Sequence, residues 1–146
     1  MAQEDTLNLR FELVSPKGMV FEGDVDMVVL PAVTGEMGIM PRHAPVVAQL
    51  SIGRLRALTT EGQWLSFAVS EGFAKVQFNK VIVLADSAEE AGDIDVDRVQ
   101  RSLERAEHRL EMYHQGTVPE GEEVDPFREQ LAIRRAKNRL KVAEVA

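Results

Sequence analysis

The sequence changes character within residues 81–99, which read Val-Ile-Val-Leu-Ala-Asp-Ser-Ala-Glu-Glu-Ala-Gly-Asp-Ile-Asp-Val-Asp-Arg-Val. The stretch begins with an uninterrupted apolar run, Val81 to Leu84, which favours a strand covered on both faces. It ends with Asp95, a residue type that often caps the N-terminus of a helix, in front of a run with helical period. These residues therefore separate a β part of the chain from an α part.

The residues before this stretch follow the pattern of β-strands. Apolar side chains alternate along Leu9, Phe11 and Leu13, which is the period of a half-buried strand. Turn signals recur at Pro16-Lys17-Gly18, Glu22-Gly23-Asp24, Thr34-Gly35, Glu61-Gly62, Glu71-Gly72 and Asn79-Lys80. Because no helical period lies between them, we expect an antiparallel β-sandwich or barrel of about 8–10 short strands over residues 1–87.

The residues after this stretch follow the pattern of helices. One helical face collects the apolar residues Val96, Val99, Leu103, Ala106, Leu110 and Tyr113, which predicts a helix over residues 96–114 with Asp95 as its N-cap. Asp125-Pro126 is typical of a second helix start, and we expect that helix over residues 126–144. The connection between them is short and polar, so residues 88–146 are predicted to form an antiparallel helical hairpin.

Composition excludes several classes of function. The chain has 146 residues, a formal net charge of −7 and no cysteine. The negative charge argues against nucleic-acid partners, and the lack of cysteine excludes disulfides, thiolate metal sites and cysteine nucleophiles. Met1 to Arg10 contains no basic segment followed by an apolar run, and no apolar stretch approaches the ~20 residues of a membrane span. We therefore expect neither a signal peptide nor direct membrane insertion.

Catalytic patterns are absent from the sequence. Its histidines, His43, His108 and His114, show no metal-ligand spacing, and no phosphate-binding loop, dinucleotide fingerprint or serine-hydrolase elbow occurs. His43 lies in the stiff segment Pro41-Arg42-His43-Ala44-Pro45, where bonding to backbone or contact with a partner is favoured over a role as general base. We expect no catalytic residue, no metal and no required cofactor.

Two features point instead to interaction. The segment Thr34 to His43 carries methionines beside charged residues, which suits protein contact, although part of it could equally point into the core. Arginines form lines on both predicted helices, at Arg98, Arg101, Arg105 and Arg109, and at Arg128, Arg135 and Arg139. These lines are either solvated helix faces or a site for an anion, whether a phosphate group or an acidic segment of another protein.

Several motifs occur together in a specific order and spacing. They are Leu30-Pro31-Ala32, Gly35-Glu36-Met37-Gly38-Ile39, Pro41-Arg42-His43-Ala44-Pro45, Ile52-Gly53-Arg54-Leu55, Glu71-Gly72-Phe73-Ala74-Lys75-Val76 and Val81-Ile82-Val83-Leu84-Ala85-Asp86. Ahead of a two-helix tail, they make the chain resemble the epsilon subunit of F-type ATP synthases. The resemblance implies a non-catalytic subunit of the rotary central stalk, at the cytoplasmic face of the bacterial plasma membrane. Such a subunit couples proton-driven rotation to ATP synthesis and restrains ATP hydrolysis through its helices.

The resemblance also implies partners and contact residues. The gamma subunit and the c-ring are expected to contact Glu36, Met37, Met40, Arg42 and His43. The beta subunits of the alpha/beta catalytic head are expected to contact Arg134, Arg135 and Arg139 when the hairpin is extended. A regulatory ATP, as in some bacterial members, would use Glu89, Ile94, Asp95, Arg98, Arg105, Arg135 and Arg139, although Val99 stands where that pattern has alanine.

Two alternatives of other classes remain open from the sequence. One is a free-standing nucleotide-binding sensor or small enzyme, which turnover by the isolated chain would favour. The other is a generic sandwich adaptor with a helical tail, which explains the loop motifs poorly.

Overall fold

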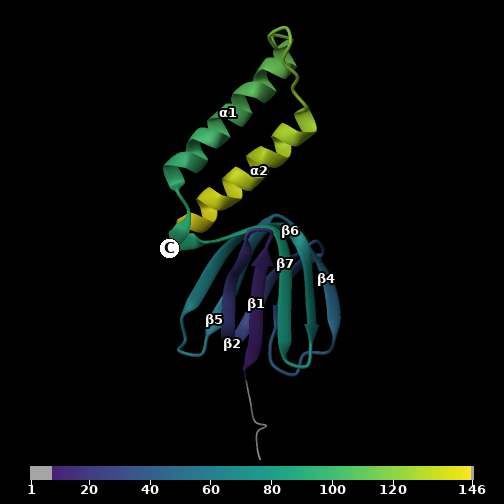
Figure 1. Ribbon diagram of the computed structural model, residues 1–146, viewed down its shortest axis with the longest axis vertical. Coiled ribbons are helices and arrows are strands. Elements are labelled where there is room, and N and C mark those ends of the chain that lie inside the picture. The colour runs from purple at the N-terminus through teal and green to yellow at the C-terminus, as the bar shows by residue number, and fades with distance from the viewer. Residues whose placement is uncertain (1–7, 146) are drawn as a thin grey trace, which may run out of the picture.

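The computed structural model describes residues 8–145, in which strands are followed by helices. The strands are β1 (Leu9–Ser15), β2 (Gly18–Ala32), β3 (Gly35–Ile39), β4 (Val46–Leu50), β5 (Gly53–Thr59), β6 (Trp64–Gln77) and β7 (Lys80–Glu90). A 3-10 turn, η2 (Ala91–Asp93), leads into α1 (Val96–Gln115) and α2 (Pro126–Ala143). The two helices form a hairpin at one end of the strands (Figure 1), which confirms the predicted sandwich with a helical tail. Most of the segment inspected for a signal peptide lies outside the described residues.

The strands are fewer and longer than the sequence predicts. Residues 8–145 contain seven strands, and β2 and β6 are 15 and 14 residues long. Glu22-Gly23 and Glu71-Gly72 carry turn-type residues but lie inside β2 and β6. Both strands continue from one layer to the other: β2 pairs with β1 and then with β3 and β5, and β6 pairs with β5 and then with β4. A kink within a strand therefore replaces an expected turn between two strands.

The pairing is antiparallel in every ladder of the described residues except one. Strands β1 and β7 run parallel, with Phe11 beside Val81 and Leu13 beside Val83. They are distant in the chain, so no tight turn forces them to be antiparallel. Their pairing closes a ring of strands in the order β1, β7, β6, β5 and β2.

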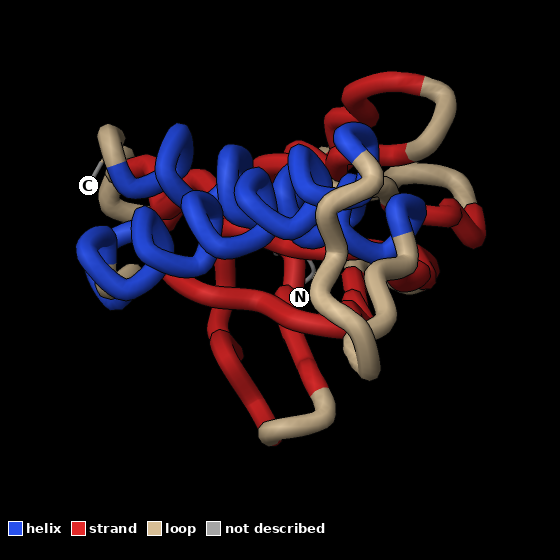
Figure 2. Tube along the Cα trace, turned by 90° about the horizontal axis from the view of Figure 1, so that it is seen from above, coloured by secondary structure: helices blue, strands red, loops and turns tan. Residues whose placement is uncertain are grey.

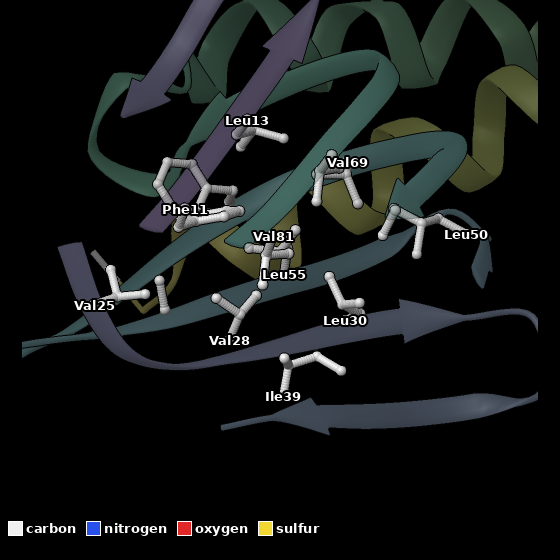
Figure 3. Close-up of a cluster of buried hydrophobic side chains, with 14 of the residues drawn as sticks. Phe11, Leu13, Val25, Val28, Leu30, Ile39, Leu50, Leu55, Val69 and Val81 are labelled. Carbon is white, nitrogen blue, oxygen red and sulfur yellow. The ribbon is translucent and has the colours of Figure 1, made fainter. Parts of the chain in front are cut away.

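The main core lies between the layers (Figure 3). Phe11, Phe21 and Phe67 form an aromatic cluster in which the ring centroids are 5.5 to 6.4 Å apart. Strand β7 contributes Val81 and Val83, whereas Leu84 on its other face is 57% exposed. The apolar run at the start of β7 is therefore not covered on both faces, because no second layer of the described chain packs outside it.

The hairpin has the predicted caps and a small core of its own. The Asp95 side chain accepts a hydrogen bond from the backbone N–H of Arg98, and Asp125 does the same for Phe127. Gly116, with φ of 70°, ends α1. Figure 2 shows the helices side by side above the strands. A second cluster joins both helices to β6 and η2, through Ala68, Ala91, Ile94, Val99, Leu103, Ala136 and Val142. Within the described residues, no helix is both long and apolar enough to cross a bilayer.

Candidate functional site

Helix α2 is attached to the sandwich by three polar contacts, which we call the latch. Arg135 Nη2 lies 2.9 Å from Glu71 Oε1, and the Arg139 guanidinium lies 2.6 Å from Glu89 Oε1. Between them, Asn138 Nδ2 donates a hydrogen bond of 2.9 Å to the carbonyl oxygen of Gly53. Asn138 and Arg139 lie three and four residues after Arg135, so the same side of the helix presents all three.

A kink in β6 places the carboxylate of Glu71 at the latch. Glu71 has a φ of 47° and Gly72 a φ of 147°, and such positive values are uncommon for residues other than glycine. A Cβ atom at Gly72 would lie 2.0 Å from the carbonyl oxygen of Leu84, so only glycine permits this approach of β6 to β7. In the sequence, Glu71-Gly72 stands out as a Glu-Gly pair within a strand pattern. That pair predicts a turn, whereas the structure has a kink that brings Glu71 to Arg135 of α2.

A cleft of about 360 Å³ lies beside the latch, between α2 and the sandwich. Its lining includes three basic side chains, Lys17, Arg135 and Arg139, and the hydroxyl groups of Ser70 and Ser87. Glu89 also lines the cleft and pairs with Arg139. An anionic ligand in this cleft would therefore compete with the carboxylates that now hold the arginines.

The residues expected to bind ATP fall into two groups. Glu89, Arg135 and Arg139 meet at the cleft. The other four lie at the start of α1 or along it: Ile94, Asp95, Arg98 and Arg105. Ile94 is buried in the hairpin core, Asp95 is engaged as the N-cap, and Arg105 donates to the hydroxyl of Ser102. Val99 is fully buried, so its side chain already fills space between the helices and the sandwich.

The three arginines expected to meet the beta subunits do not share one face. Arg135 and Arg139 are held at the latch, whereas Arg134 is exposed. Arg134 lines a groove between the helices together with Glu107 and Glu111 of α1. In the packed hairpin, Arg134 is the member of this set that makes no ion pair within the described residues.

The residues expected to contact gamma and the c-ring are distributed along β3 and the loop after it. Met37 packs against the main core, and Glu36 is exposed near the β2–β3 turn. Met40, Arg42 and His43 follow the other end of the strand. The segment that sequence suggested as one contact loop is therefore partly a strand, since alternate residues of β3 point inward.

The loop after β3 is held by backbone and side-chain hydrogen bonds. The N–H of Arg42 donates to Asn79 Oδ1 at 2.6 Å, and His43 Nδ1 donates to the carbonyl oxygen of Ala44 at 2.7 Å. His43 thus makes the backbone contact that its sequence context favours. Among residues 8–145, no group of three His, Asp or Glu side chains is placed to hold a metal ion.

An exposed apolar face was missed by the sequence reasoning. Phe73 of β6 pairs with Leu84 of β7, and both side chains are more than half exposed, as is that of Val47 on β4. Alternation within β6 would have revealed Phe73 as an outward residue, since Ala74 and Val76 point inward.

Comparison with known proteins covers both parts of the chain. A family profile described as "ATP synthase, Delta/Epsilon chain, beta-sandwich domain" matches residues 8–91, and "ATP synthase, Delta/Epsilon chain, long alpha-helix domain" matches residues 93–144. An ATP synthase epsilon chain of Desulforamulus reducens is 42% identical over 135 residues, covering 92% of this chain and 96% of the relative. The epsilon chain of Halalkalibacterium halodurans is 46% identical over 136 residues, with coverage of 92% and 96%.

Solved structures show the same fold at low sequence identity. A chain of the Euglena gracilis mitochondrial ATP synthase, in a structure of OSCP, F1 and the c-ring, matches with a TM-score of 0.74 and 20% identity. The match covers 96% of this chain and 82% of that one. The family profiles and the relatives, together with the sandwich and the two-helix hairpin, lead to one conclusion: the chain belongs to the delta/epsilon-chain family of ATP synthases.

Proposed function

We propose that the chain is the epsilon subunit of a proton-translocating ATP synthase and turns with its central stalk as a coupling subunit. Membership of the family supports this role, as do the surfaces that the sandwich leaves uncovered. Met40, Arg42 and His43 would contact the c-ring and the base of gamma, and Glu36 would extend that contact. The apolar face around Phe73 and Leu84 offers gamma a further surface, because large exposed apolar side chains mark contact sites.

The hairpin is the regulatory part of this proposal. In the packed state described here, Arg135 and Arg139 are paired with sandwich carboxylates. Acidic segments of the beta subunits would offer alternative carboxylates, and an extended hairpin bound to them would restrain ATP hydrolysis. The latch is the observation that carries this idea, since it holds the arginines by contacts that another anion can replace.

ATP is proposed as a regulatory ligand rather than a substrate. Glu89, Arg135 and Arg139 already meet at the cleft, whose lining holds three basic side chains against two acidic ones, Asp86 and Glu89, and the basic groups could bind phosphate. ATP would shift the hairpin toward whichever state binds it more tightly, and only by that difference in affinity. The chain itself would carry no catalytic centre and would sit at the cytoplasmic face of the plasma membrane through its partners. A free-standing nucleotide sensor is the rival function.

The restraint can be tested by locking the hairpin. The chain has no cysteine, so Glu71→Cys with Arg135→Cys gives a unique pair for a short, cleavable crosslinker. In the assembled ATP synthase, we expect the crosslinked subunit to lose the restraint on ATP hydrolysis, and cleavage of the crosslinker to restore it. The same double variant before crosslinking is the matched control, because it carries both substitutions. Equal hydrolysis rates in the locked and released states would contradict the inhibitory role.

The ligand can be tested separately on the full-length chain. Millimolar ATP should raise the melting temperature and change the NMR shifts of α2 and Glu89, because a ligand that binds only the folded state stabilises it. Arg139→Gln should remove the effect, whereas Arg101→Gln, on the exposed face of α1 away from the cleft, should not. Turnover of ATP by the isolated chain would favour the rival function.

A further inference from the structure

The turn between β6 and β7 adopts a conformation that its first residue disfavours. Phe78 and Asn79 are the two residues between the paired positions Gln77 and Lys80, with φ values of 51° and 57°. A two-residue turn with both φ values positive is the type I′ hairpin turn, which prefers asparagine, aspartate or glycine. Asparagine tolerates this region, but a bulky phenylalanine there is strained.

The strained backbone at Phe78 is not compensated by packing of its side chain within the described chain. The side chain of Phe78 is 88% exposed, more than any other large apolar residue found exposed in residues 8–145. A phenylalanine that packed into the core would offset its backbone cost by burial, and Phe78 does not. Strain without an internal benefit is typical of residues that serve a contact outside the chain.

The turn is also fixed in position. Asn79 accepts the N–H of Arg42 through its side chain at 2.6 Å and the N–H of Arg10 through its carbonyl oxygen at 2.9 Å. The first bond ties the turn to the loop after β3, in which Met40 is 58% exposed. The backbone of the turn is thus fixed beside the loop already proposed as a contact, and an aromatic side chain, with only two rotatable bonds, loses little entropy on binding.

We propose that Phe78 is a binding anchor that inserts into an apolar pocket of a protein partner, and that Met40, on the loop tied to the turn, adds to the same contact. The partner would be the assembly of the gamma subunit and the c-ring in the rotor, so the inference rests on the proposed function. It adds a residue that neither the sequence motifs nor the predicted contact set contains. Exposed aromatic side chains of this kind commonly dominate the binding energy of an interface.

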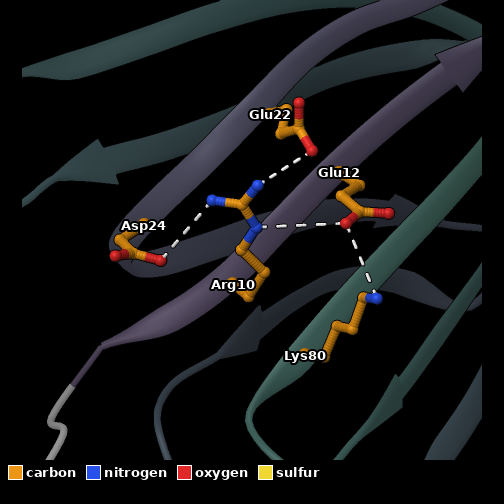
Figure 4. Close-up of polar contacts among 5 residues, drawn as sticks. All are labelled: Arg10, Glu12, Glu22, Asp24 and Lys80. Atoms are coloured by element: carbon orange, nitrogen blue, oxygen red, sulfur yellow. Dashed lines mark ion pairs between the residues drawn. The ribbon is translucent and has the colours of Figure 1, made fainter.

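The charges around the turn favour a protein over an anionic membrane surface. Arg10 is ion-paired with Glu12, Glu22 and Asp24, and Lys80 is paired with Glu12 (Figure 4). With Arg42, whose backbone N–H is bonded to Asn79, three bases stand against three carboxylates, so this surface carries no net charge. An anionic membrane attracts proteins through a surplus of basic residues, which this surface lacks, whereas a partner pocket with a neutral rim would fit.

Phe78→Asn in the full chain separates anchoring from a structural role. Asparagine suits the type I′ turn, so we expect the melting temperature to rise by about 2–4 °C. Binding to the detergent-solubilised gamma–c-ring subcomplex of the same synthase should weaken at least about tenfold. Phe78→Leu should retain part of that affinity, because leucine keeps an apolar side chain. Phe127→Asn is the matched control, since it removes another exposed phenylalanine, on α2, and should leave this binding unchanged.

Each other outcome overturns a defined part of the idea. Unchanged binding of Phe78→Asn overturns the anchor alone, whereas no binding by the unchanged chain overturns the rotor role and the anchor with it. A lower melting temperature would show that Phe78 stabilises the fold. Flotation with vesicles of phosphatidylcholine and phosphatidylserine, lost in Phe78→Asn, would assign the anchor to a membrane. If the chain forms a dimer and Phe78→Asn dissociates that dimer, the pocket that binds Phe78 would belong to a second copy of the chain.

Discussion

The sandwich and the hairpin are held together internally by different kinds of contact. The sandwich core is closed around large side chains, among them Phe11, Leu13 and Phe67, which are fully buried. The cluster that joins the hairpin to the sandwich is smaller, with seven buried residues of which three are alanines, Ala68, Ala91 and Ala136. The latch adds ion pairs whose side chains remain between 35% and 44% exposed.

This difference gives the two parts unequal stabilities. Truncating a buried phenylalanine costs about 3–5 kcal/mol, whereas an exposed ion pair contributes about 0–1 kcal/mol. We therefore expect that the hairpin could leave the sandwich while the sandwich stays folded. A regulatory element that changes position requires such a weak attachment beside a stable body.

The largest effect is expected in the aromatic cluster of the core. Phe67→Ala should reduce the free energy of unfolding by about 3–5 kcal/mol, through lost burial and the cavity left beside Phe11 and Phe21. Urea unfolding followed by the fluorescence of Trp64, the one tryptophan of the chain, measures it. Phe127→Ala, on an exposed position, should change stability by less than about 0.5 kcal/mol. Equal losses in the two variants would contradict the contrast between the core and the hairpin surface.

The kink in β6 connects the sandwich with the hairpin, because it places Glu71 against Arg135 of α2. Gly72→Ala places a Cβ atom against the carbonyl oxygen of Leu84 and requires a positive φ, so we expect a loss of about 2–4 kcal/mol. It should also displace Glu71 from Arg135 and expose α2 amides to hydrogen exchange. Gly62→Ala is the control, because that turn glycine also has a positive φ but its added Cβ would meet nothing within 4 Å. Normal protection of α2 in Gly72→Ala would show that the kink does not position the latch.

The hairpin core should respond more weakly and more locally. Val99→Ala should destabilise the packed hairpin by about 1–2 kcal/mol, because Val99 is fully buried in the cluster that joins the helices to the sandwich. Hydrogen exchange of α1 should quicken while the protection of β1 and β7 stays unchanged. The same variant restores the alanine of the ATP-binding pattern, so ATP should protect it more than the unchanged chain. Faster exchange throughout the sandwich would show that the two parts unfold as one unit.

Local patterns predicted the elements, and long-range contacts decided the site. Asp95 and Asp125 predict where the helices begin, because an N-cap bonds only to backbone N–H groups a few residues further along the chain. The pairing of Glu71 with Arg135 joins residues far apart in the sequence and depends on a kink that resembles a turn signal. Phe78 was overlooked for a similar reason: Asn79-Lys80 marked a turn at that place, but exposure and positive φ emerge only from the three-dimensional structure.

The smallest effect, and the most direct test of the comparison, concerns the latch itself. Glu71→Gln and Glu89→Gln each keep the shape of the side chain and remove its charge, so each should weaken hairpin packing by no more than about 1 kcal/mol. Hydrogen exchange of α2 amides should quicken up to about fivefold in each variant, and Glu107→Gln, which makes no ion pair in the described residues, should leave it unchanged.

Salt separates the charge of the latch from its shape. At about 1 M NaCl the screening length falls to about 3 Å, so partly exposed ion pairs lose most of their attraction. The rate of hydrogen exchange of α2 amides in the unchanged chain should then approach the rate in the double variant that carries both Glu71→Gln and Glu89→Gln. Protection that resists both salt and the double substitution would locate the attachment in the apolar cluster instead. In that case an acidic partner could not release the hairpin by competing for Arg135 and Arg139, and the proposed restraint on hydrolysis would need another trigger.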